Sequence, residues 1–173
     1  PRYDLDDEAL AAVIDGEPVS RRALDLMHAV AVKRRPETTP SEADLSQTVP
    51  IREIKSTHVG KIHKHLKALG PEDRYLRFGY AATDEQIGEY INSLDFERDS
   101  LFGIYNRRLD LIAMAHLSYS IDPDCASCAE FGVSVAQASR GRGYGTRLFE
   151  RAITHARNEG VRLLFVHALS ENT

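Results

Sequence analysis

Apolar residues recur with helical spacing in three stretches between residues 59 and 160 of this chain. We expect the first helix to end at Gly70-Pro71 and the second to begin at the capping pair Thr83 and Gln86. The third covers Thr146–Glu159 and ends at Gly160. The inward positions are Val59, Ile62, Leu66 and Leu69, then Ile87, Tyr90, Ile91 and Leu94, then Leu148, Phe149, Ala152, Ile153 and Ala156.

Shorter apolar runs beside these helices predict five strands. They are Val49–Ile54, Leu101–Tyr105, Leu111–Tyr119, Glu130–Val135 and Val161–Leu169. The last run is almost unbroken, as expected of a strand buried on both faces. The polar segment Asn106–Asp110 is typical of a hairpin turn. The resulting order, β-α-α-β-β-β-α-β, predicts an α/β (α+β) fold whose last step is a right-handed crossover.

Residues 1–48 differ from the remainder. A short helix is predicted around Leu10, Val13 and Ile14, and a second amphipathic helix follows Pro18. The polar segment Pro36–Ser41, with a proline near each end, is typical of a linker. We therefore divide the chain into a helical N-terminal extension, residues 1–48, and a folded domain, residues 49–173. The extension is expected to be a docking arm or a piece of a neighbouring domain.

Composition narrows the function further. The chain has 173 residues, 42% hydrophobic and 28% charged, which is ordinary for one globular domain. Its formal net charge of −4 argues against a nucleic-acid partner, because such proteins carry a basic excess. No apolar run approaches the ~20 residues of a membrane-spanning helix, so we expect no membrane partner. The oligomeric state is left open, a homodimer included.

The two cysteines, Cys125 and Cys128, form one CxxC between the turn Asp122–Asp124 and a strand. A thioredoxin-like site would place this pair before a helix, and a zinc site would need four ligands. Neither condition is met. We therefore expect two reduced hairpin cysteines, no metal and a cytoplasmic protein.

The segment Ser139–Thr146, between a strand and the third helix, carries the clearest chemistry. Glycines occupy its alternate positions, at Gly141, Gly143 and Gly145. Glycine lets backbone N–H groups approach a ligand closely, and a helix N-terminus favours phosphate oxygens. Arg140 and Arg142 add positive charge of a geometry that suits phosphate. These features together predict an anionic ligand.

The spacing of this loop excludes two nucleotide-binding motifs, G-x-G-x-x-G and the Gly-Lys-Ser/Thr loop. What is present is [Gln/Arg]-x-x-Gly-x-Gly, filled by Arg140, Gly143 and Gly145. This motif resembles the one that binds the pyrophosphate of acetyl-CoA in the GCN5-related N-acetyltransferase (GNAT) superfamily. The element order from Val49 to Leu169 is also similar to the family's first five strands. The resemblance implies a mixed central sheet flanked by helices, with acetyl-CoA as the acetyl donor.

The resemblance also implies a set of residues that hold the donor. Ala129–Val135 lies where the family's fourth strand diverges from the fifth and pairs with the pantetheine arm. Asn172 matches an Asn that often contacts the cofactor there, but it is equally typical of a turn at a strand end. The implied cofactor-binding residues are Val133, Ser134, Val135, Arg140, Gly141, Arg142, Gly143, Tyr144, Gly145, Thr146 and Asn172.

Acetylation of an amine with a pKa of ~10.4 requires a proton acceptor. Glu130 is the candidate base, because an acidic residue here resembles the bacterial protein-lysine acetyltransferase branch. Strand alternation points it opposite to Val133 and Val135, and it could instead serve the loop backbone. His116 is more typical of a structural histidine. The histidines of the first helix, His58, His63 and His65, are expected on a solvated face.

The acceptor substrate is the part of the function that the sequence determines least. Arg74–Phe78 resembles the Arg-Tyr-x-Arg-Phe stretch that lines the acceptor site in bacterial lysine acetyltransferase domains, although its aromatic residues could also anchor the loop. We expect acetyl transfer to a protein lysine by direct attack. The alternatives are a small-molecule amine, or a non-catalytic acyl-CoA-binding module. The family's usual general acid is a Tyr beyond the fifth strand, and the chain ends at Thr173, so the C-terminal part of the fold is expected to be missing.

Overall fold

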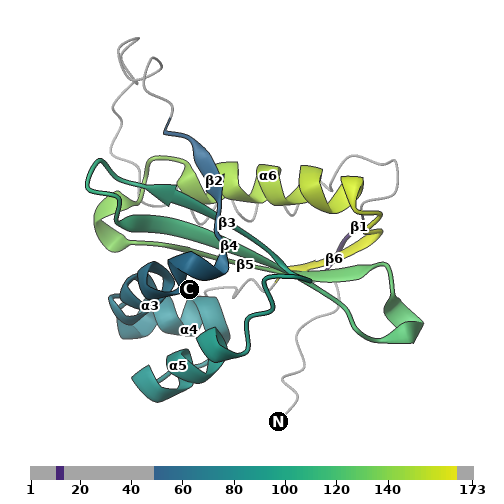
Figure 1. The fold of residues 1–173 in the computed structure, drawn as a ribbon, viewed down its shortest axis with the longest axis horizontal. Coiled ribbons are helices and arrows are strands. Elements are labelled where there is room, and N and C mark those ends of the chain that lie inside the picture. Colours follow the sequence, from purple (N-terminus) through teal and green to yellow (C-terminus); the bar gives the residue numbers. More distant parts are fainter. Residues whose placement is uncertain (1–10, 14–48, 167–173) are drawn as a thin grey trace, which may run out of the picture.

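The structure, a computed structural model, describes residues 11–13 and 49–166. Its centre is a six-stranded sheet in the order β1-β6-β5-β4-β3-β2 (Figure 1). All neighbouring strands are antiparallel except β5 and β6, which run parallel, so the sheet is mixed as expected. The strands are β1 Ala11–Val13, β2 Ile51–Glu53, β3 Ser100–Tyr105, β4 Leu111–Tyr119, β5 Cys128–Val135 and β6 Leu163–Val166.

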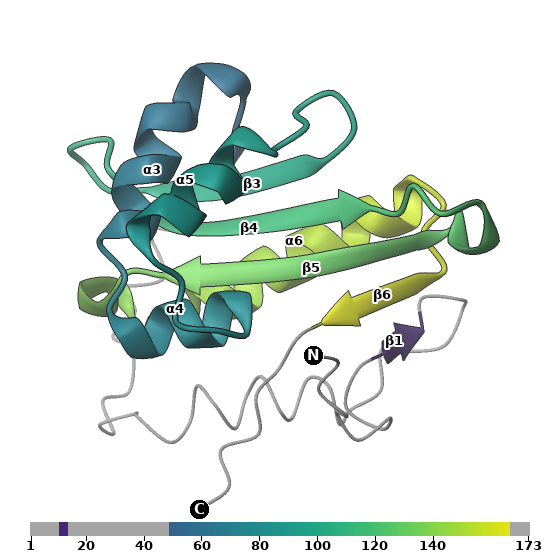
Figure 2. The same cartoon turned by 90° about the horizontal axis from the view of Figure 1, so that it is seen from below.

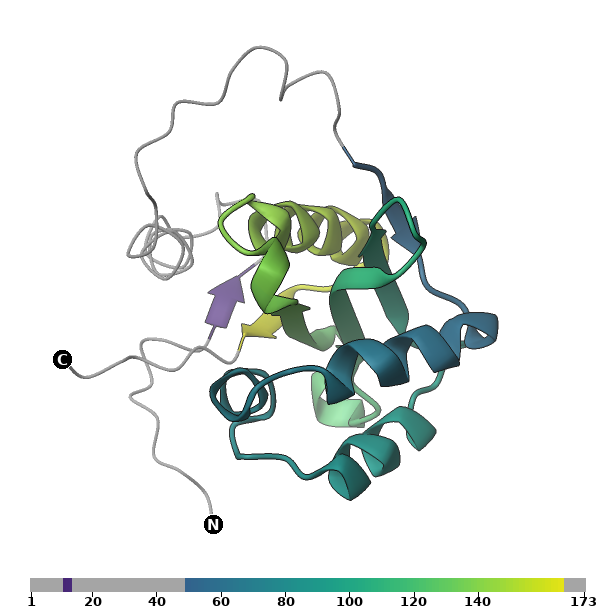
Figure 3. The same cartoon turned by 90° about the vertical axis from the view of Figure 1, so that its left-hand side faces the viewer.

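The helices cover the two faces of the sheet separately (Figures 1 and 3). Helices α3 Val59–Lys67, α4 Pro71–Phe78 and α5 Asp84–Asn92 lie on one face, and α6 Tyr144–Asn158 lies on the other. Short 3₁₀ turns join these elements: η1 Ser56–His58, η2 Pro123–Cys125 and η3 Gln137–Ser139. The chain is therefore an α/β fold of three layers.

Strand β4 separates two apolar cores. Ala113, Ala115 and Leu117 pack with Leu148 and Phe149 of α6 in the first core. Met114, on the opposite face, packs with residues of α3 and α5 in the second, among them Ile62, Leu66, Ile87 and Ile91. This alternation of period two along β4 buries both faces of the sheet.

Most of the predicted elements are confirmed. Thr83 caps α5 through the reciprocal pair with Gln86, at 3.3 Å and 2.9 Å. Helix α4 was missed, because Gly70-Pro71 was read only as the end of α3. Its signals were nevertheless present: Pro71 begins it, two acidic residues follow in its first turn, and Gly79 ends it with a φ of 79°.

Ala11–Val13 depart from the prediction. They were assigned to a short helix, but they form β1 and pair with Leu163–Phe165 of β6. The physical reason is that the outer edge of β6 offers unpaired backbone groups, which another strand can satisfy. The rest of the N-terminal extension and residues 167–173, Asn172 included, lie outside the described residues.

The cysteine prediction was also wrong. Cys125 and Cys128 form a disulfide instead of two free thiols, because the 3₁₀ turn η2 brings their Cα atoms to 5.3 Å. The cytoplasmic location rested partly on free thiols and stays a prediction without that support. In the described part of the chain, no helix has the length and apolar character needed to cross a bilayer.

Candidate active site

The glycine-rich loop makes the sharp entry into α6. Gly141 and Gly143 have φ of 74° and 75°, in the left-handed region that favours glycine. A Cβ at either position would meet nothing within 4 Å, so the space outside the turn is open. The first bond within α6 runs from Arg147 N–H to Gly143 C=O at 3.1 Å. The N–H groups of residues 144–146 therefore precede the helical hydrogen-bond ladder and are available to an anion.

The side chains of this loop have different surroundings. Arg142 is exposed, whereas Tyr144 is buried in the core under α6. Arg140 forms an ion pair with Asp73 of α4. A Cβ on Gly145 would lie 3.8 Å from Val135, so the start of α6 packs closely on the end of β5. The loop thus adjoins the last residues of β5.

Strand β5 turns alternate residues toward different neighbours. At the end of its pairing with β4, Ala136 N–H donates to Ile112 C=O at 2.8 Å, while Ala113 lies opposite Val135. In an antiparallel pair this arrangement puts the even-numbered residues of β5 in hydrogen-bonded pairs with β4. The backbone groups of Val133 and Val135 therefore point away from β4, toward the side of β6.

The pairing of β5 with β6 covers only the first half of β5. It joins Cys128–Phe131 to Leu163–Val166, and β5 then runs on to Val135. In Figure 2 the two strands diverge toward their C-terminal ends. Among residues 49–166, no strand pairs with the outward backbone groups of Val133 and Val135.

The even-numbered side chains of β5 lie on the face covered by α3, α4 and α5. Glu130 is exposed on this face, and Gly132 lies under the guanidinium of Arg77. The hydroxyl of the buried Ser134 bonds to His65 Nε2 at 2.8 Å. The structure thus decides the face of Glu130, which the sequence left open. Ser134 has its backbone directed at β4 and its hydroxyl at His65.

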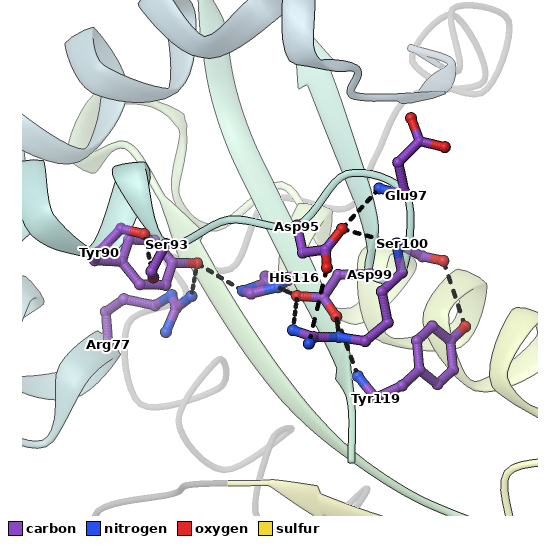
Figure 4. Close-up of polar contacts among 10 residues, drawn as sticks. Arg77, Tyr90, Ser93, Asp95, Glu97, Asp99, Ser100, His116 and Tyr119 are labelled. Atoms are coloured by element: carbon purple, nitrogen blue, oxygen red, sulfur yellow. Dashed lines mark hydrogen bonds and ion pairs between the residues drawn. The ribbon is translucent and has the colours of Figure 1, made fainter. Parts of the chain in front are cut away.

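A chain of hydrogen bonds runs from α4 through α5 and β4 to the residue before β3 (Figure 4). Arg77 Nη2 donates to the Tyr90 hydroxyl at 2.7 Å. The Tyr90 hydroxyl lies 2.8 Å from His116 Nδ1, and His116 Nε2 lies 2.9 Å from Asp99 Oδ2. Since a carboxylate only accepts, Nε2 carries the proton and Nδ1 accepts from Tyr90. Arg98 Nε also donates to Asp99, at 2.9 Å.

The pKa shifts agree with this proton arrangement. Burial lowers the pKa of His116, and the charge of Arg77 acts in the same direction, so the imidazole is neutral at pH 7. Burial opposes ionisation of Asp99, but the hydrogen bonds from Arg98 and His116 outweigh it and lower the pKa of Asp99. Burial raises the pKa of Tyr90, which keeps its hydroxyl protonated.

His65 corrects the prediction of a solvated histidine face on α3. It is 4% exposed, and its Nδ1–H donates to Leu111 C=O at 3.1 Å. Its Nε2 therefore accepts from the Ser134 hydroxyl. Burial lowers the pKa of His65 to about 4. Its position three residues after Ile62, on the apolar side of α3, was the signal that could have found it.

The comparison with known families decides the identity. Residues 71–173 match the Acetyltransferase (GNAT) family. The chain belongs to the GNAT family of acetyltransferases. It is therefore an acetyl-CoA-dependent N-acetyltransferase, whose second substrate is an amine.

Solved GNAT structures have the same fold. The GNAT domain of S. lividans PAT matches with a TM-score of 0.58 and 21% identity, over 70% of this chain and 73% of that one. A GCN5-related N-acetyltransferase from Kribbella flavida has a TM-score of 0.52 and 22% identity, over 66% and 68%. An N-acetyltransferase from Staphylococcus aureus Mu50 has a TM-score of 0.55 and 16% identity, over 73% of this chain and 76% of that one. No curated protein sequence matches the chain.

For this GNAT protein, sequence reasoning missed part of the site. Tyr90 was assigned only to the apolar face of its helix, and Asp99 was not singled out. No local signal marks Asp99, because its contacts with His116 arise from strand packing across 17 positions.

Among the described residues no cluster of three or more His, Cys, Asp or Glu could hold a metal ion.

Proposed function

We propose that this N-acetyltransferase acetylates the side-chain amine of lysine in a protein. The observation that supports it most is the arrangement of three features along β5 and the loop that follows it. These are the outward backbone of Val133 and Val135, the open turn at Gly141 and Gly143, and the exposed carboxylate of Glu130. A candidate phosphate site, a strand edge left unpaired by the described residues and a candidate base are thereby carried by one strand and the loop after it.

In this proposal the pyrophosphate of acetyl-CoA binds at the N-terminus of α6. The N–H groups of residues 141–146 would hold its oxygens, and Arg140 and Arg142 would neutralise its charge. Arg140 would have to exchange Asp73 for phosphate. Asn172 remains a proposed contact. Ser134, whose groups are directed at β4 and His65, would support the strand from behind.

The pantetheine arm would pair with the outward backbone of Val133 and Val135, as an added strand does at a sheet edge. A backbone N–H there would polarise the thioester carbonyl. The amine nitrogen attacks the carbonyl carbon, the new C–N bond forms, and the C–S bond breaks. Glu130 takes the proton that the protonated amine loses before attack. The second proton, which the nitrogen loses once the C–N bond has formed, passes to the departing sulfur to give free coenzyme A.

A protein acceptor is supported by the surface around α4. Tyr75, Leu76 and Tyr80 are 46%, 40% and 45% exposed, which is high for large apolar side chains. They lie on or just after the helix whose Arg77 contacts β5. Exposed apolar and aromatic residues on and after this helix favour a macromolecular surface as the partner, since aromatic residues are enriched in protein interfaces.

The test measures release of coenzyme A from acetyl-CoA with three acceptors: a lysine peptide with a blocked N-terminus, the same peptide with its side-chain amine blocked, and a small diamine. We expect turnover with the first peptide alone. Glu130→Gln should lower kcat roughly 100-fold or more, whereas Glu150→Gln, on α6, should not. Turnover with the diamine alone would overturn the proposed acceptor, and unchanged kcat in Glu130→Gln would remove the proposed base.

A further inference from the structure

The guanidinium of Arg77 lies directly on the backbone of β5. A Cβ built on Gly132 would be 2.5 Å from both Cζ and Nη1 of Arg77, closer than any side chain tolerates. Position 132 must therefore be glycine for Arg77 to occupy this place. The contact brings a full positive charge to the residue that precedes Val133.

Several contacts fix Arg77 there. Its Cζ lies 5.0 Å from the ring centroid of Phe78 and 5.2 Å from that of Tyr90. Its Nη2 donates to the Tyr90 hydroxyl, which His116 and Asp99 hold in turn (Figure 4). Its Nε is buried and has no hydrogen-bond partner among the described residues. Burying this donor without a partner costs free energy of folding. The charge of Arg77 is thus held in a place that the stability of the fold alone does not require.

The groups facing Arg77 come from every neighbouring element. Glu130 lies on the same face of β5, and Tyr90, His116 and His65 come from α5, β4 and α3. Burial is the main reason that the pKa values of His65 and His116 are lowered, and the charge of Arg77 adds to both shifts. The field of Arg77 therefore opposes further positive charge on this face.

We propose that Arg77 is an electrostatic positioning residue of the acceptor site, which disfavours the protonated form of the incoming amine beside Glu130. The inference rests on the proposed function, in which the amine attacks a thioester held at Val133. The bound ammonium loses its proton to Glu130, and the neutral nitrogen then forms the C–N bond. A neighbouring cation favours this neutral form, as it does for other nucleophilic amines.

The experiment compares Arg77→Met, which removes the charge, with Arg77→Lys, which keeps it. The control Arg157→Met removes the same charge from an exposed position on α6, on the other face of the sheet. The pH dependence of kcat is measured for each variant with saturating lysine peptide, because kcat reports groups in the ternary complex. A thermal shift with acetyl-CoA shows that each variant is folded and binds the donor.

We expect the acidic limb of the kcat profile of Arg77→Met to move up by about 1 pH unit, with a roughly tenfold loss at pH 7 that disappears at high pH. Arg77→Lys and Arg157→Met should keep the limb of the original protein. An equal loss at every pH, or a limb in Arg77→Lys that moves as far as in Arg77→Met, overturns the inference. If the unsubstituted protein releases no coenzyme A with the lysine peptide, the proposed function fails instead.

Discussion

At the residue scale, three glycines of the proposed site are distinguished by their backbone angles and by their neighbours. Gly141 and Gly143 adopt left-handed backbone angles at the entry to α6. Gly132 lies in a regular strand and leaves free the space that the guanidinium of Arg77 occupies. The glycine at position 132 is therefore explained by a contact from α4, whereas the other two are explained by the backbone conformation of their own loop.

This distinction gives a prediction for Gly143→Val. A β-branched residue at a φ of 75° strains the turn and displaces the N–H groups that we assign to the pyrophosphate. Acetyl-CoA binding, measured by calorimetry, should be lost. The matched control is Gly160→Val, at a φ of 81° beyond the other end of α6, which incurs similar strain but should keep the affinity. Retained binding in Gly143→Val would show that the phosphate site lies elsewhere.

At the element scale, α4 contacts both the proposed donor site and the proposed acceptor site. Asp73 and Arg77 are four residues apart and so lie on the same side of the helix. Asp73 contacts Arg140 of the donor loop, and Arg77 contacts Gly132 of β5. Figure 2 shows α4 beside the C-terminal end of β5, where the glycine-rich loop begins. Donor binding at Arg140 would therefore release one contact that holds α4.

Asp73→Asn tests this competition between the carboxylate and phosphate. Removing the carboxylate frees Arg140, so the dissociation constant for acetyl-CoA should fall by roughly two- to fivefold, as expected for a partly exposed ion pair. Glu72→Gln removes the same charge from the same turn of α4 and serves as the control. Equal affinity changes in the two variants would mean that only the overall charge of α4 matters.

At the scale of the whole molecule, His65 joins three elements. From α3 it hydrogen-bonds the backbone of β4 at Leu111 and the hydroxyl of Ser134 on β5. A buried neutral imidazole ties this helix to the sheet just behind the outward edge of β5. Protonation of His65 would place an unpaired charge in this interface.

Stability should therefore depend on pH through His65. Its pKa is lowered from 6.5 to about 4 on folding, so the unfolded chain binds the extra proton between these values. The stabilisation is complete above pH 6.5 and is lost as pH falls toward 4, by on the order of 3 kcal/mol. Urea unfolding at pH 7 and pH 5 checks it. His65→Asn should be less stable at pH 7 yet lose less on acidification, and an identical loss would contradict this role.

The sequence by itself determined the features that depend on neighbours along the chain. Helical spacing and the capping pair of Thr83 and Gln86 marked α5, and the alternate glycines from Gly141 to Gly145 marked the tight turn before α6. These signals are readable because the hydrogen bonds and backbone angles involved link residues within four positions of each other.

Only the tertiary structure decided which side chains meet. Arg77 reaches Gly132, His65 reaches Ser134, and Asp99 orients His116 because helices pack on strands that lie far from them in sequence. The face to which Glu130 points could be assigned only from the elements that pack against β5 on each side of the sheet. Period-two alternation shows that Glu130 and Val133 point to opposite faces, but packing alone determines which helices cover each face.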